Sequence, residues 1–129
     1  MEYVRGRKDG QPSAPGTGTF TGRALLDPVL DEPGARVNSV SFEPGARTYW
    51  HSHTGGQVLM ATAGRGVVET REGDLRVLQA GDVVWAPPGE VHWHGAAPGS
   101  FLAHTAISLG QTVWADEVTE EHYTTATGE

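Results

Sequence analysis

Apolar and polar residues alternate along this chain in short runs that turn residues separate. In Val37–Glu43 (VNSVSFE) the alternation has the two-residue period of a half-buried β-strand. Similar runs recur about every 8–12 residues, between turns rich in Gly, Pro and Asp, which is typical of an all-β sandwich or barrel. The sequence therefore predicts an all-β fold.

The same pattern divides the chain into three parts. Residues 1–18 are polar and rich in Gly and Pro, and we expect a flexible N-terminal arm there. The strand pattern occupies residues 19–110, which we interpret as one barrel. Residues 111–129 form a C-terminal tail, in which Ala115–Thr124 is the segment that could form a short helix.

Composition excludes several kinds of chemistry. The 129 residues include no Cys, so disulfides, thiolate metal sites and cysteine nucleophiles are impossible. The formal net charge of −7 argues against a nucleic-acid partner. No apolar stretch approaches the roughly 20 residues that span a bilayer, and the first residues lack the apolar region of a secretory signal. We therefore expect a cytoplasmic protein without a membrane partner.

Three histidines and a glutamine form the main candidate for chemistry. On a strand, His51 and His53 face the same way and lie about 6.6 Å apart along the backbone, so both rings can reach one ion. Gln57 follows across the Thr54–Gly56 turn, where a hairpin would return it beside the two rings. His92 comes from a separate strand. We predict that these four side chains bind one divalent metal ion per chain.

Alternation also sorts the residues around His92. His92 and His94 share one face of their strand, while Val91 and Trp93 share the other. The imidazoles would point to the enclosed side and the large apolar groups outward. Because sheet edges and outward Trp rings need covering, we expect a homodimer or a tetramer.

The spacing of these residues resembles the two motifs of the cupin family. Gly45-x5-His51-x-His53-x3-Gln57-x6-Gly64 resembles the first motif, and Gly81-x5-Pro87-x-Gly89-x2-His92 resembles the second. The resemblance implies a single cupin barrel, which is a double-stranded β-helix or jelly roll. Two positions depart from the family pattern: Gln57 stands where Glu is usual, and Ala96 stands where Asn is frequent.

The glutamine has a consequence for the metal. With Gln57 and three neutral histidines the site keeps the full charge of a divalent ion, so a bound hydroxyl is acidified more strongly than beside a glutamate. Such a neutral N/O site suits Mn, Fe, Co, Ni, Cu or Zn. The ligands alone do not choose between these metals.

Four longer sequence segments narrow the resemblance to the manganese-dependent bacterial cupin hydroxynitrile lyases. These segments are Phe42–Thr48 (FEPGART), Gly81–Trp85 (GDVVW), Pro88–Glu90 (PGE) and His92–Pro98 (HWHGAAP). The resemblance implies reversible cleavage of an aromatic cyanohydrin to an aldehyde and cyanide, with Mn as the first candidate metal.

The same resemblance assigns roles to three further residues. His94 would take the substrate's hydroxyl proton as general base. His104 would hold or protonate the leaving cyanide, and Thr48 would hydrogen-bond substrate or water. Two other functions remain open: an iron- or copper-dependent dioxygenase of a small organic substrate, and a non-catalytic cupin that binds a small ligand. Side chains such as Asn38, Val40 and Ser108 would shape the cavity.

Overall fold

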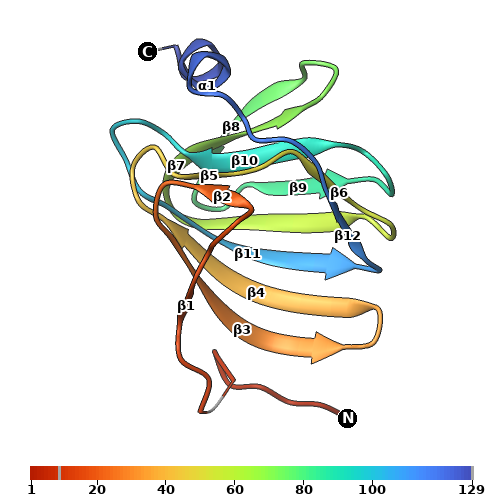
Figure 1. Ribbon diagram of the computed structural model, residues 1–129. Helices are drawn as coiled ribbons and strands as arrows, with labels where there is room; N and C mark the ends of the chain where they lie inside the picture. The colour runs from red at the N-terminus through yellow and green to blue at the C-terminus, as the bar shows by residue number, and fades with distance from the viewer. Residues whose placement is uncertain (9, 129) are drawn as a thin grey trace.

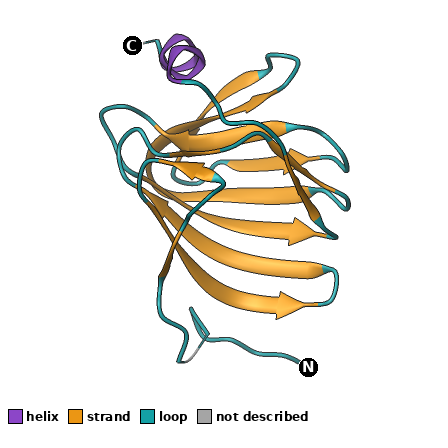
Figure 2. Cartoon of the chain, in the orientation of Figure 1, coloured by secondary structure: helices purple, strands orange, loops and turns teal. Residues whose placement is uncertain are grey.

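Short strands separated by turns make up most of the computed structural model, which describes residues 1–8 and 10–128 (Figures 1 and 2). In chain order the strands are β1 (Ala14–Pro15), β2 (Phe20–Thr21), β3 (Ala24–Glu32), β4 (Ala35–Phe42), β5 (Arg47–Thr48), β6 (His51–His53), β7 (Gln57–Thr70), β8 (Leu75–Gln79), β9 (Val83–Ala86), β10 (His92–Ala96), β11 (Leu102–Leu109) and β12 (Thr112–Trp114). One helix, α1 (Glu120–Thr127), follows them near the C-terminus. The predicted all-β class is confirmed.

The strands form one sheet that curls around a central space. Its path runs β1-β3-β4-β11-β7-β10-β5-β2, and every recorded pairing is antiparallel. Strand β7 belongs to both halves of the curl: its first half pairs with β11 and β9, and its second half pairs with β10 and β8. This arrangement is a jelly-roll barrel (Figure 1).

A glycine allows β7 to pass from one half of the sheet to the other. Gly64 lies at this corner with φ of +76°, a conformation that only glycine adopts readily. A Cβ atom at this position would also lie 1.9 Å from the carbonyl oxygen of Phe101. The corner therefore needs Gly64 both for its backbone angle and for the close approach of β11.

Strand β11 shows the predicted alternation most clearly. Its buried residues are Leu102, His104, Ala106 and Ser108, and the residues between them are only partly buried. Leu102 packs in the main apolar cluster with Phe42 and Leu59. The alternation therefore places His104 and Ser108 on the inner face of the barrel, on the strand that leads toward β12.

A second apolar cluster lies outside the barrel, beneath the C-terminal tail. Trp50 and Trp93 project from the sheet and pack with Val67, Val118 and Tyr123. The hydroxyl of Tyr123 donates to the carbonyl of Ala96 at 2.6 Å. The tail of the same chain therefore covers the two outward rings.

A buried arginine fixes this tail. The Arg47 guanidinium lies 4.3 Å from the centre of the Tyr123 ring, donates to the Val118 carbonyl and pairs with Glu120 at 2.9 Å. The expected homodimer stays a prediction, and the outward apolar residues that remain exposed near the sheet include Val83 and Trp85.

The helix begins later in the tail than the sequence indicates. Residues 115–118 are not helical: the backbone N–H of Trp50 donates to the carbonyl of Asp116, and the N–H of Ala115 donates to the carbonyl of Trp50. Thr119 then caps the helix by accepting from the backbone N–H of His122, and α1 runs over Glu120–Thr127. Helix formation therefore starts where the tail leaves the sheet.

Regular structure also extends beyond residues 19–110. Strand β1, within the first 18 residues, pairs with β3, and strand β12, after residue 110, pairs with β6. Among the described residues, no helix is long and apolar enough to cross a membrane.

Candidate metal centre and cavity

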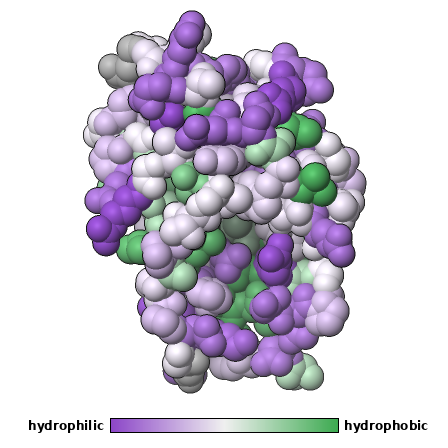
Figure 3. Space-filling view, viewed as in Figure 1, coloured by the Kyte–Doolittle hydropathy of each residue, from purple (hydrophilic) through white to green (hydrophobic). Residues whose placement is uncertain are grey.

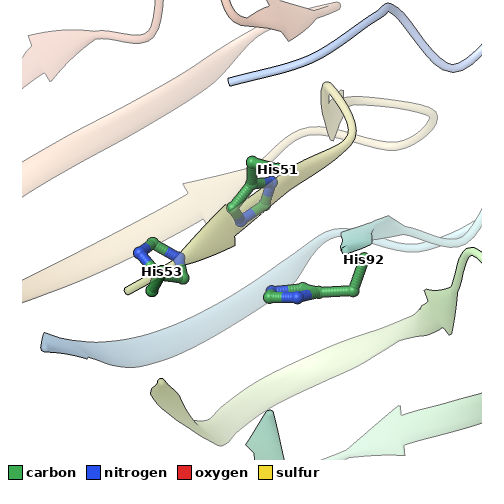
Figure 4. A group of neighbouring side chains, drawn as sticks. All are labelled: His51, His53 and His92. Atoms are coloured by element: carbon green, nitrogen blue, oxygen red, sulfur yellow. The ribbon is translucent and has the colours of Figure 1, made fainter. Parts of the chain in front are cut away.

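Three buried histidines meet on the inner face of the barrel. His51 and His53 come from β6, and His92 comes from β10, where it is the register partner of His51. One nitrogen from each ring lies within 4.8 Å of the nitrogens of the other two. The rings point toward one another from two neighbouring strands (Figure 4).

Hydrogen bonds to carbonyl groups set the tautomer of two of the three rings. The Nδ1 atom of His51 lies 2.8 Å from the Tyr49 carbonyl, and Nδ1 of His92 lies 3.0 Å from the Glu90 carbonyl. Because a carbonyl only accepts, each Nδ1 carries the proton and each Nε2 keeps a lone pair. The Nε2 atom of His53 is buried without a hydrogen-bond partner. The three histidines thus present metal-binding atoms to one point.

Gln57 completes the group. Its Nε2 atom donates to Ser108 Oγ at 3.1 Å, which turns its Oε1 atom toward His92 Nε2 at 2.9 Å. Two atoms that both offer lone pairs repel each other at this distance. A cation with metal–ligand bonds of about 2.1 Å at right angles holds two ligands about 3 Å apart. The observed pair therefore fits a metal ion.

Burial keeps the histidines neutral, which is the form that binds metal. Burial lowers the pKa of His51 well below its usual value, and the neighbouring His92 lowers it further. The pKa of His53 falls to about 4, first through burial and then through the charges of His92 and Arg36. Burial also lowers the pKa of His92. All three rings are neutral at neutral pH.

A second pair of histidines lies beside this group. His104 Nε2 and His94 Nδ1 are 3.0 Å apart, and the centre of the His94 ring is 5.2 Å from that of His51. Burial lowers the pKa of both rings, that of His104 to about 4, and the charge of His104 lowers that of His94 further. His94 Nε2 is buried without a hydrogen-bond partner. This ring nitrogen lies beside the candidate metal ligands, since the His94 ring contacts that of His51.

Thr48 orients the strand that carries His94. Its Oγ1 atom accepts from the backbone N–H of His94 at 3.2 Å, which leaves the hydroxyl proton of Thr48 free to donate elsewhere. Thr48, His94 and His104 line the same cavity as His51, His53 and Gln57, and His92 contacts this group through Gln57 Oε1. The structure therefore brings the seven predicted site residues together.

The cavity has a volume of about 460 Å³ and opens to solvent. Figure 3 shows it as a hollow with hydrophobic side chains inside and polar ones around it. Asn38, Val40 and Ser108 line it, as the sequence indicates. The volume is in the range of pockets that bind small organic molecules.

Sequence reasoning missed several residues of the wall. Arg36, Thr112 and Trp114 line the cavity, and Thr112 Oγ1 lies 3.0 Å from Nδ1 of His53. The Trp114 ring lies 4.7 Å from the ring of His51. The alternation of Thr112 and Trp114 around Val113 was the available signal, but the pairing of β12 with β6 is not encoded locally.

Comparisons with known proteins agree with this geometry. The cupin domain family matches residues 38–105. The chain is 46% identical over 111 residues to an (R)-mandelonitrile lyase from Granulicella tundricola, covering 81% of this chain and 85% of that protein.

Solved structures show the same architecture. The chain is similar to a cupin-like protein from Thermotoga maritima, with a TM-score of 0.84, 40% identity and 98% of each chain covered. It also resembles a predicted oxalate decarboxylase from Thermotoga maritima, with a TM-score of 0.71 and 19% identity over 85% of this chain and 100% of the other. The second likeness shows the fold alone.

The chain therefore belongs to the cupin family. Its barrel holds three histidines in position to bind one metal ion. A relative that covers most of its length is a mandelonitrile lyase.

Proposed function

We propose that this cupin is a metal-dependent lyase that cleaves and forms a small aromatic cyanohydrin. The observation that carries the proposal is His94, whose buried Nε2 atom has no hydrogen-bond partner and faces the cavity beside the metal ligands. The likeness to a protein named (R)-mandelonitrile lyase supports the substrate class. The candidate ligands are His51, His53, Gln57 and His92.

The neutral ligand set favours Lewis-acid chemistry. A bound divalent ion, with Mn²⁺ as the first candidate, supplies positive charge that stabilises negative charge on the substrate oxygen. None of the ligands carries a negative charge that would reduce this effect. The carboxamide of Gln57 is held in place by Ser108.

Proton transfer falls to the two histidines outside the ligand set. We assign the proton between the two rings to His94 Nδ1, which then donates to His104 Nε2, so that the lone pair of His94 Nε2 is available to take the hydroxyl proton of the cyanohydrin. As the carbon–carbon bond breaks, its electron pair leaves with cyanide and the hydroxyl oxygen becomes the aldehyde oxygen. The proton on His94 then passes to cyanide, which leaves as hydrogen cyanide and restores the base.

Thr48 and His104 position this reaction. The free hydroxyl proton of Thr48 donates to the substrate oxygen or to a water in the cavity. His104 holds the His94 ring in the tautomer that the reaction requires.

The test is cleavage of mandelonitrile by protein loaded with Mn²⁺, with and without oxygen. We expect benzaldehyde release above the buffer rate in both conditions. His94→Gln, which can still bond to His104, should lose roughly a hundredfold or more of this activity. His122→Gln, a substitution in the exposed helix α1, is the matched control and should keep it.

Two results would contradict the proposal. Activity that requires oxygen and consumes it would favour the dioxygenase. Stoichiometric metal binding without turnover on cyanohydrins would favour the non-catalytic ligand-binding protein.

A further inference from the structure

The cavity wall carries positive charge and no described acidic group. The chain has a net charge of −7, yet its described cavity-lining residues include no Asp or Glu. They do include one cation, Arg36, whose side chain is only partly exposed. A bound divalent ion would add further positive charge. The cavity interior is therefore electrostatically opposite to the rest of the molecule.

Arg36 lies in the same row of the sheet as one candidate ligand. Its register partner on β11 is Ser108, and the partner of Ser108 on β7 is Gln57. Partners in register share a face of the sheet, so these three side chains project into the barrel side by side. The row continues to His92 through the contact between Gln57 Oε1 and His92 Nε2.

A hydroxyl links the guanidinium to the histidine group. Arg36 Nη2 donates to Thr112 Oγ1 at 2.9 Å, and Thr112 Oγ1 lies 3.0 Å from His53 Nδ1. The guanidinium is thus two hydrogen-bond lengths from His53. Its charge reaches the ring, because it contributes to the lowered pKa of His53.

Arg36 has no carboxylate partner among residues 1–8 and 10–128. Its register partner on β3 is Asp31, which is exposed, forms no ion pair with it and does not line the cavity. Five other arginines do form ion pairs, and their Asp or Glu partners all lie outside the cavity. A guanidinium has five N–H donors, and Thr112 occupies only one of them.

We propose that the preferred substrate of this site carries a carboxylate at the end remote from its reacting carbon, and that Arg36 binds this carboxylate. The inference rests on the proposed function, since the reacting end would lie at the histidines. The planar guanidinium can bind a carboxylate through two parallel hydrogen bonds.

The first experiment compares two cyanohydrins, mandelonitrile and its 4-carboxy derivative. The protein loaded with Mn²⁺ should have the higher kcat/KM for the carboxylated substrate. In Arg36→Gln the ratio of the two kcat/KM values should fall roughly tenfold or more, because a charge-assisted pair is lost. Arg36→Lys should retain part of the preference. Arg65→Gln, which removes an exposed arginine and the same charge, should leave the ratio unchanged.

A binding measurement separates this inference from the proposed function. Titration calorimetry with benzoate and with neutral benzamide, on metal-loaded protein of verified metal content, requires no turnover. We expect benzoate to bind more tightly than benzamide. The ratio of the two dissociation constants should fall roughly tenfold or more in Arg36→Gln. If neither cyanohydrin reacts but this difference appears, the lyase proposal fails and the role of Arg36 stands.

Two outcomes would overturn the inference. One is equal affinity of the wild type for benzoate and benzamide, which needs no variant. The other is benzoate affinity that is the same in wild type, Arg36→Gln and Arg36→Lys, which would assign the carboxylate to the metal rather than to Arg36.

Discussion

The free energy of unfolding of the metal-free protein should decrease as the pH falls from about 7 to about 5. The burial of His104 should account for part of this decrease, and the size of that part can be calculated. His104 is 1% exposed, and its pKa falls from 6.5 in an unfolded chain to about 4 in the fold, mainly through burial. Between pH 6.5 and about 4, His104 is therefore protonated in the unfolded chain and stays neutral in the folded chain. Stability is unaffected above pH 6.5 and decreases as the pH falls toward 4.

The size of this effect follows from the two pKa values. Each pH unit in that window costs about 1.4 kcal/mol per group, so His104 alone should remove about 2 kcal/mol by pH 5. His51, His53, His92 and His94 have lowered pKa values as well and act in the same direction.

Urea unfolding of wild type and His104→Gln, in a chelator and at a series of pH values, measures this term. The glutamine can still bond to His94, and it does not titrate. The free energy of unfolding of the variant should fall less steeply, with a difference of about 2 kcal/mol in the total loss by pH 5. Parallel curves for the two proteins would refute the assignment of a low pKa to His104.

Other predictions concern the corner, the tail and the metal. Gly64→Ala should destabilise the protein by several kcal/mol more than Gly45→Ala in urea unfolding, since both have positive φ but only Gly64 has a backbone atom in the way; equal losses would contradict this. Tyr123→Phe removes the hydrogen bond to the Ala96 carbonyl and should cost about 1–2 kcal/mol, so an unchanged unfolding midpoint would count against the tail contact. Mn²⁺ should raise the melting temperature of wild type, and Gln57→Glu should bind it more tightly, by titration, but turn over more slowly; faster turnover would contradict the argument from charge.

The barrel and much of the site could be predicted because their signals are local. Alternating side chains and turn glycines mark the strands, and the i, i+2 spacing of His51 and His53 puts both rings on one face. The hairpin expected at Thr54–Gly56 does not form, because β6 pairs with β10 and β12 while the start of β7 pairs with β11 and β9. Gln57 reaches the histidines from a different part of the curled sheet. The same alternation places His94 on the face of His92.

The parts that escaped prediction depend on pairing between distant segments. Thr112 and Trp114 enter the site only because β12 pairs with β6, which lies almost sixty residues earlier in the chain. Trp93 was correctly predicted to face outward, but its cover comes from Val118 and Tyr123 of the tail. No sequence motif marks Arg36 as a site residue. Its proposed role depends on the absence of acidic residues among the described residues that line the cavity, which only the fold reveals.

The metal content of protein purified without a histidine tag tests the central claim most directly. Elemental analysis should find one divalent ion per chain in the wild type, and His53→Ala should lose most of it. His122→Ala, which changes a histidine of α1, should keep the wild-type content. Equal and substoichiometric metal in wild type and His53→Ala would contradict the claim that these histidines and Gln57 hold one ion within the barrel.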